Sequence, residues 1–317
     1  MSFSYDAVIF FSGDRAAALK TLSSLAGQKE APGRIFLPCL SGEEDALKGT
    51  FKNAEILPLP SRDRGLVISQ AVRQSGASYL LLVSDQAGQL SPEFSSGLFE
   101  HFSCDPAAEI VFSNISGAVK DKVISRAFYD ALFSVCPAYG KEEIFSFGPQ
   151  LFYRDIGAAL FKTALLRECP IEVNALTDPA RIFTAHALYR DARVHCDVDL
   201  RTEEQKKLSI SALFHDAFSL AAARRLYYQS FGIGFRMHQK MRGTGYTKNP
   251  VLPVSMGKAY GRAGKKAAGT LLKHGAFYKL PALFLIVLSG RMGDALGSWY
   301  HRLPGKLNRA LSGKRYF

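Results

Sequence analysis

Apolar runs and amphipathic segments alternate along the first two hundred residues. Short, almost wholly apolar runs predict buried strands, and the amphipathic segments between them predict helices. The predicted strands are 6–12, 34–38, 54–59, 78–84 and 109–114, and the predicted helices are 15–28, 64–76 and 91–102. Strands separated by helices are typical of βαβ units, so we expect an α/β fold with a mostly parallel sheet flanked by helices.

The pattern changes in the second half of the chain. Between about 115 and 156 it is weak, and it then predicts a strand running into a helix at 157–169, a helix at 178–191 and a strand at 192–201. After residue 203 it becomes helical, with a loop at 243–253. We therefore predict two parts, an α/β domain at 1–200 and a helical C-terminal extension at 201–317.

Charge divides the chain at the same place. Residues 201–317 hold 21 of the 40 Lys and Arg and 4 of the 28 Asp and Glu, a balance of +17, whereas residues 1–200 carry −5. We expect the basic extension to meet an anionic lipid surface or nucleic acid, and a solvated basic face without a partner is the alternative.

One apolar stretch stands out in the extension. Residues 280–290 lie between Lys279 and Arg291 and are too few to span a bilayer. The stretch predicts either a helix lying in the membrane interface or a helical hairpin with these residues in its core.

The remaining composition narrows the class of protein. Apolar residues make up 47% of the chain, enough for a sizeable core. The 5 cysteines are scattered without a CxxC pair, which predicts reduced thiols rather than a zinc site. No secretory leader is recognisable at the first residues, so we expect a cytoplasmic protein.

Two polar stretches could carry chemistry. The apolar run 79–83 ends at Ser84 and Asp85, and a carboxylate at the end of a buried strand is a common position for a ligand-binding group. His195, Asp197 and Asp199 share one face of another predicted strand, and we interpret them as a polar strand face rather than a metal site.

Several motifs, in this order, resemble family 2 glycosyltransferases of the GT-A fold, which is Rossmann-like. The segment VIFFSGDRAAALKTLSSLAGQ resembles the first strand, turn and helix of that family, and DRG stands at its next helix start. SDQAGQLSPEF resembles the Asp-x-Asp region of the rhamnosyltransferase branch. LLKHGAFYKLPALF and HRLPGKLNRALSGKRYF resemble C-terminal segments of the same branch.

The resemblance implies a reaction. A sugar, such as rhamnose from a dTDP or UDP donor, would move with inversion onto a polysaccharide or a lipid-linked glycan, with the enzyme peripheral at the inner face of the plasma membrane. Such a reaction needs a general base for the acceptor hydroxyl. It also needs Mg²⁺, Mn²⁺ or basic side chains to receive the charge of the leaving diphosphate.

Carried over residue by residue, the resemblance implies specific roles. Asp178 is the general base, and Asp85 is the first acid of the Asp-x-Asp motif and a weak metal contact. The other positions implied to bind the nucleotide sugar are Ser12, Asp14, Arg64 and Cys39, and Cys39 stands where the family has the Asp that reads the base.

Ala87 stands where the family has its metal-binding acid, and this departure leaves alternatives open. The enzyme is metal-independent, with Arg62, Arg64 or later basic residues receiving the charge, or it binds Mg²⁺ or Mn²⁺ weakly through Asp85 and the diphosphate. A catalytically inactive, glycosyltransferase-like binding protein is the next alternative. A basic nucleic-acid-binding protein is the last, and we consider it the least favoured.

Overall fold

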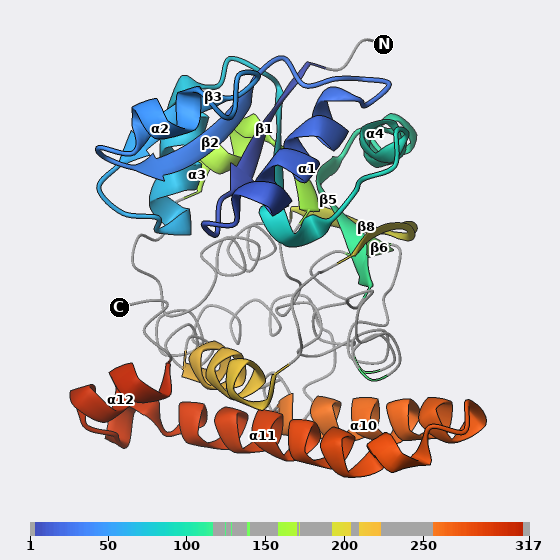
Figure 1. Cartoon of the computed structure of the whole chain (residues 1–317). Coiled ribbons are helices and arrows are strands. Elements are labelled where there is room, and N and C mark those ends of the chain that lie inside the picture. Colours follow the sequence, from blue (N-terminus) through green and yellow to red (C-terminus); the bar gives the residue numbers. More distant parts are fainter. Residues whose placement is uncertain are drawn as a thin grey trace, which may run out of the picture.

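An eight-stranded sheet forms the centre of the computed structural model (Figure 1), with strand order β3-β2-β1-β4-β7-β5-β8-β6. The structure describes residues 4–116, 124, 128, 138–139, 158–169, 171, 192–203, 209–222 and 256–312. The strands are β1 Tyr5–Phe10, β2 Ile35–Leu40, β3 Glu55–Leu59, β4 Tyr79–Ser84, β5 Ala108–Ser116, β6 Ala138–Tyr139, β7 Ala158–Lys162 and β8 Arg193–Glu203.

The sheet is mostly parallel, as predicted, with one reversal near its middle. β3, β2, β1 and β4 run parallel to one another, and β5 runs parallel to β8. β7 lies between β4 and β5 and is antiparallel to both, and β6 is antiparallel to β8. The carboxyl ends of β1 and β4 are adjacent, because Phe10 pairs with Ser84.

Helices cover both faces of the sheet. Those of the α/β part are α1 Arg15–Ala26, α2 Glu44–Lys48, α3 Arg64–Gln74, α4 Phe94–Cys104 and α7 Thr163–Glu168. α1 and α4 contribute buried residues to the apolar cluster on one face, and α3 and α7 contribute to the cluster on the other. Both faces of the parallel strands are therefore buried, which explains their nearly continuous apolar sequence.

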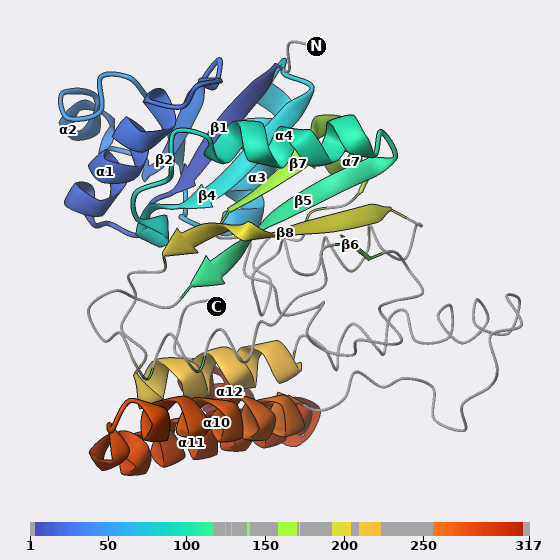
Figure 2. The same ribbon diagram turned by 90° about the vertical axis from the view of Figure 1, so that its right-hand side faces the viewer.

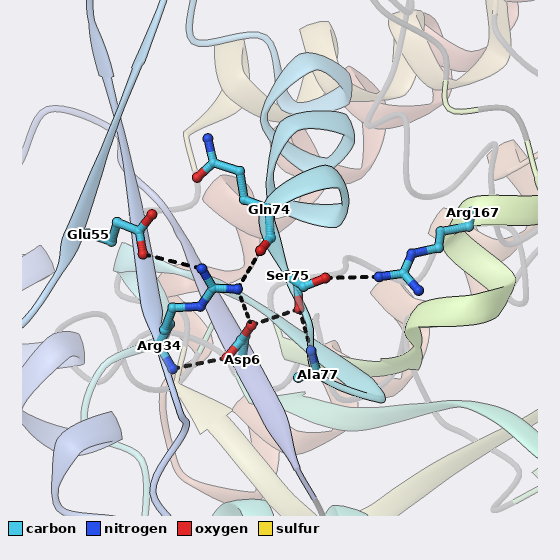
Figure 3. Close-up of polar contacts among 7 residues, drawn as sticks. All are labelled: Asp6, Arg34, Glu55, Gln74, Ser75, Ala77 and Arg167. Carbon is cyan, nitrogen blue, oxygen red and sulfur yellow. Dashed lines mark hydrogen bonds and ion pairs between the residues drawn. The ribbon is translucent and has the colours of Figure 1, made fainter.

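A polar network closes the amino edge of the sheet (Figure 3). Asp6 at the start of β1 is buried and accepts hydrogen bonds from the Arg34 backbone N–H at 3.0 Å and the Ser75 hydroxyl at 2.7 Å. The Arg34 guanidinium pairs with Asp6 and Glu55 and also donates to the Gln74 carbonyl. Asp6 thus joins β1, β2 and the end of α3 at the edge opposite the carboxyl ends.

The C-terminal part forms a helical layer (Figures 1 and 2). It comprises the helix Ile210–Ala222, α10 Met256–Lys273, α11 Leu280–Ser298 and α12 Gly305–Leu311. A Cβ at Gly297 would lie 2.2 Å from the Phe218 carbonyl oxygen, and one at Gly264 would lie 2.5 Å from Val287 Cγ2. These glycines let α11 pack closely against Ile210–Ala222 and α10.

α11 is longer than the apolar stretch 280–290 on which the sequence prediction was based. Together with the 3-10 turn Phe277–Lys279 it forms a helix over Phe277–Ser298 that is long and apolar enough to cross a membrane by length and composition. In its most apolar window 39% is buried within the protein. The prediction that this segment is too short to span a bilayer is therefore wrong, because the observed helix is longer than the apolar stretch 280–290.

The predicted elements that the structure describes are confirmed in type. Most of their boundaries differ by one or two residues, and the start of α4 differs by three. α4 begins at Phe94 and not at 91, because residues 91–93 form a turn that Gln28 holds by accepting from the Ser95 N–H and donating to the Ser91 carbonyl. The sequence did not predict the short helix α2 or the two-residue strand β6. The predicted helix 178–191 and loop 243–253 lie outside the described residues.

Candidate functional site

Four neighbouring strands end side by side at the carboxyl edge of the sheet. β3, β2, β1 and β4 are adjacent and parallel, so the residues that follow them meet at one rim. The strand order reverses between β1 and β4, where α/β sheets usually bind ligands. The groups at this rim include Ser12, Arg62 and Asp85.

Asp85 is held in place by the turn after β1. Its Oδ2 accepts from the Ser12 N–H at 2.6 Å and from the Ser12 hydroxyl at 2.7 Å. Gln86 Nε2 lies 3.2 Å from the Ser12 hydroxyl oxygen and 3.4 Å from Asp85 Oδ1. The Asp85 side chain is buried, so these short bonds fix its carboxylate against the β1 turn.

Hydrogen bonds between neighbouring side chains and the backbone also hold the turn that contains Asp85. Asp85 to Ala87 form one 3-10 turn that Ser84 caps, and the Thr21 hydroxyl donates to the Asp85 carbonyl at 3.2 Å. Ala87 is buried among the apolar residues on the α1 and α4 face. Its methyl group therefore packs into the core at the position where the resemblance expects a second acid.

Arg62 brings a positive charge to the same rim. Its Nη2 lies 2.9 Å from Glu43 Oε2, and its guanidinium carbon lies 5.2 Å from the centre of the Phe11 ring. A Cβ on Gly13 would lie 3.3 Å from Arg62 Nη1, so the guanidinium sits against the β1 turn. Arg62 Nε is buried and has no hydrogen-bond partner among the described residues.

Glu43 connects the ends of β2 and β3. It accepts from the Leu40 N–H at 3.1 Å in addition to its pair with Arg62. The hydrogen bonds from Arg62 and then Leu40 lower the pKa of Glu43. Glu43 therefore stays ionised at neutral pH and orients the guanidinium.

The other predicted contacts have different surroundings. Asp14 is exposed and caps α1, with its Oδ1 accepting from the Ala17 N–H at 3.1 Å. The Arg64 guanidinium carbon lies 4.8 Å from the centre of the Phe10 ring. The structure thus brings Ser12, Asp14 and Asp85 together at the β1 turn, and Arg64 begins the neighbouring helix α3.

Cys39 lies in the core rather than on the rim. Its side chain is fully buried, and burial, followed by the nearby Glu44 and Glu43 carboxylates, raises its pKa. A nucleotide at this strand end would therefore meet backbone and not the thiol, and the role of Cys39 stays a prediction. Asp178, the predicted general base, lies outside the described residues.

The described residues do not form a divalent-cation site. No three His, Cys, Asp or Glu side chains gather closely enough to hold a metal within the part of the chain that the structure describes. Asp85 is the one carboxylate of the β4 turn, and its Oδ2 already accepts two short hydrogen bonds. Such a donor set does not fit the six oxygen ligands that Mg²⁺ prefers.

The segment 195–199 (HCDVD) takes part in two His–Asp contacts. His195 Nε2 lies 2.8 Å from Asp105 Oδ2, and His101 Nε2 lies 3.0 Å from Asp197 Oδ2. Cys196 points to the opposite face and is buried. The interpretation of this stretch as a polar strand face agrees with these contacts.

Sequence reasoning missed Gln86 as a member of the rim, and it did not predict the pairing of Glu43 with Arg62. Gln86 directly follows Asp85, so its place in a tight turn was the available signal. Glu43 lies 19 residues before Arg62, and only the pairing of β2 with β3 brings them together. No sequence pattern pointed to this ion pair.

Several solved glycosyltransferase structures share this arrangement of elements. The mannosyltransferase PcManGT from Pyrobaculum calidifontis, solved with GDP-Man and Mn²⁺, is 12% identical and has a TM-score of 0.59 over 96% of this chain and 89% of its own. The chain has the GT-A fold. The C-terminal helical part is included in this similarity, because the match covers nearly the whole chain.

Two further GT-A structures match a smaller part of the chain. Mannosyl-3-phosphoglycerate synthase from Rubrobacter xylanophilus is 14% identical, with a TM-score of 0.54 over 73% of this chain and 75% of its own. Glucosyl-3-phosphoglycerate synthase from Mycobacterium tuberculosis, in complex with Mn²⁺, UDP and glucosyl-3-phosphoglycerate, is 8% identical, with a TM-score of 0.53 over 73% and 80%. No protein family and no curated protein matches the chain by sequence.

Proposed function

We propose that this protein is a glycosyltransferase that takes a sugar from a nucleoside-diphosphate donor bound at the rim of the GT-A sheet. The observation that carries the proposal is the Asp85 carboxylate, fixed by Ser12 at the point where the strand order reverses. The donor would be a dTDP- or UDP-sugar, with rhamnose as the transferred sugar on the strength of the sequence resemblance.

The acceptor step follows from the chemistry of inversion. An acceptor hydroxyl gives its proton to the Asp178 carboxylate while its oxygen attacks the anomeric carbon. The bond from that carbon to the diphosphate breaks on the opposite side, and the diphosphate leaves with the bonding electrons. The new glycosidic bond lies on a polysaccharide or lipid-linked glycan.

We propose that Arg62 receives the charge of the leaving diphosphate. The Arg62 side chain is about one-third exposed, its guanidinium lies against the β1 turn, and its buried Nε–H has no partner among the described residues. Arg binds phosphate oxygens through paired N–H donors. It can therefore neutralise the leaving diphosphate, as a divalent cation would do in a metal-dependent transferase. Under this proposal the reaction is metal-independent; weak Mg²⁺ or Mn²⁺ binding through Asp85 is the competing route.

The first experiment is a titration with dTDP, UDP and GDP, with Mn²⁺ and with EDTA, followed by assays of donor hydrolysis. We expect binding of one nucleotide and turnover that EDTA does not change. Turnover that EDTA abolishes would favour the metal-bound route.

Arg62→Gln and Glu43→Gln form a matched pair of variants. Removing the cation should lower nucleotide affinity and reduce turnover about 100-fold, because a charge partner of the leaving group is lost. Removing only the anion leaves the cation and frees it from its partner, so affinity should be equal or higher. Equal effects of the two variants would show that the ion pair is structural.

A catalytically inactive binding protein is the second candidate, favoured by Ala87 in the place of the acid. It would bind the nucleotide sugar without turnover. Asp178→Asn separates the two, since it should abolish turnover in an enzyme while leaving nucleotide affinity unchanged.

A further inference from the structure

The exposed large apolar side chains gather on one part of the molecule. Eleven are exposed among the described residues, and ten of these lie between Leu272 and Leu307. Two aromatic residues, Phe277 and Tyr278, precede α11, and Trp299 follows it, each more than half exposed. Such a concentration differs from the scattered apolar residues of ordinary protein surfaces.

Their spacing places them on one face of α11. The exposed apolar residues of the helix and its end recur every three or four positions and are Leu285, Leu288, Met292, Leu296 and Trp299, with Phe284 beside them. We call these six residues the outer face of α11. Their spacing is that of a single helical stripe.

The opposite face of α11 is fixed to the protein. Gly293 and Gly297 meet Ile210–Ala222, where an added Cβ would lie 2.5 Å from the Phe214 carbonyl oxygen and 2.2 Å from the Phe218 one. Ser289 donates its hydroxyl to the Ile210 carbonyl. The helix therefore cannot turn to bury its outer face, and leaving the protein to span a bilayer would break this packing.

The C-terminal helical part that carries the outer face is positively charged. Residues 256–312 contain ten Lys and Arg and one acidic residue, Asp294. Asp294 is buried and accepts from the Gly257 N–H at 3.0 Å. The exposed cations of this part are Arg262, Lys265, Lys266, Lys273, Arg291, Arg302 and Lys306.

Each end of α11 combines an exposed aromatic ring with a cation. Lys279 Nζ lies 5.9 Å from the centre of the Tyr278 ring, and the Arg302 guanidinium carbon lies 5.3 Å from the Trp299 ring. Aromatic rings and basic side chains together favour the boundary between headgroups and acyl chains.

We infer that the outer face of α11 docks on an anionic lipid bilayer, with the helix lying in the plane of the interface. Apolar side chains enter the acyl boundary, and the surrounding cations meet lipid phosphates. A second copy of the chain is the poorer occupant, because pairing these surfaces would bring like charges together. The carboxyl ends of β1 and β4 lie on the side of the sheet nearer the helical layer (Figures 1 and 2), so under the proposed function a lipid-borne acceptor would approach from that side.

The test is co-sedimentation of the full chain with vesicles of phosphatidylcholine alone or mixed with phosphatidylglycerol. We expect binding to the anionic vesicles that weakens with added salt, and little binding to the neutral ones. Trp299 is the single tryptophan of the chain, so its fluorescence should shift to the blue and resist aqueous quenchers on binding. A wild-type chain that stays in the supernatant with both vesicles overturns the inference.

Variants locate the contact. Leu288→Ser with Met292→Ser should weaken binding to anionic vesicles about tenfold or more, because two exposed side chains lose their apolar area. Ile210→Ser, an exposed apolar residue outside the outer face, is the matched control and should bind as wild type. Equal binding by the double variant and the control, or a dimer that the double variant dissociates, would assign the face differently and overturn the inference.

Vesicle binding and the proposed function can fail separately. Nucleotide titrations without vesicles measure the donor site, and the double variant should keep wild-type nucleotide affinity. If the wild type binds none of the nucleotides, the proposed function is rejected, and the proposed docking of α11 on lipid is still tested by the vesicle experiments.

Discussion

Ala87 is a core residue at the position where the sequence resemblance expects a metal-binding acid. Its methyl group packs among buried apolar side chains directly after Asp85, on the α1 and α4 face of the sheet. Restoring an acid here would therefore bury a carboxylate in an apolar cluster. Packing therefore favours alanine at this position, whatever its effect on metal binding.

Ala87→Asp should destabilise the protein and not create a metal site. We expect the free energy of unfolding in urea to fall by about 2 kcal/mol or more, because a buried charge lacks partners. Ala87→Asn adds similar bulk without charge and should cost less. If Mn²⁺ raises the midpoint of Ala87→Asp but not of Ala87→Asn, the residue can reach the rim after all.

At the level of elements, the sequence predicted the strands and helices better than their order in the sheet or the direction of their side chains. The apolar run before Asp85 predicted β4, and the capping residue Asp14 predicted the start of α1. Local pattern could not place β7 antiparallel between β4 and β5, because that order depends on long-range pairing. It also could not distinguish a Cys39 side chain facing the core from one facing a ligand.

The glycines of α11 and α10 give the sharpest prediction at this scale. Gly297→Ala should lower the free energy of unfolding by about 2 kcal/mol, because its Cβ would clash with backbone of Ile210–Ala222. Gly269→Ala in α10 meets nothing within 4 Å and should raise stability by about 0.5–1 kcal/mol through helix propensity. Urea unfolding of both variants checks the pair, and a loss of the same size in each would contradict the packing of α11.

Across the whole molecule, two His–Asp pairs join α4 and its C-terminal cap to β8. Burial raises the pKa of Asp105, but hydrogen bonds from Arg193 and His195 outweigh it, and the net pKa is lowered. Burial likewise opposes the hydrogen bonds from Leu200 and His101 that lower the pKa of Asp197. Both carboxylates bind a proton less readily in the folded chain than in the unfolded one.

These shifts predict a loss of stability in acid. A carboxylate with a lowered folded pKa stabilises the protein fully above its unfolded pKa of about 3.9, and this contribution is lost as the pH falls through the lower folded value. The urea midpoint of Asp105→Asn with Asp197→Asn should be lower than that of the wild type at pH 7. The two midpoints should converge as the pH falls below the unfolded value of about 3.9 and through the lowered folded values. If the difference between the two urea midpoints is the same at every pH, the pairs stabilise the protein by packing and not by the charge of the carboxylates.

The network around Asp6 determines which end of the chain is suited to attachment. β1 starts beside this closed amino edge, on the side of the sheet away from α11 (Figure 1). A reporter or surface tether joined before Tyr5 would leave the carboxyl rim of the sheet and the outer face of α11 accessible. α12 belongs to the helical layer itself (Figure 1), so a label attached on this helix would stand closer to the outer face of α11.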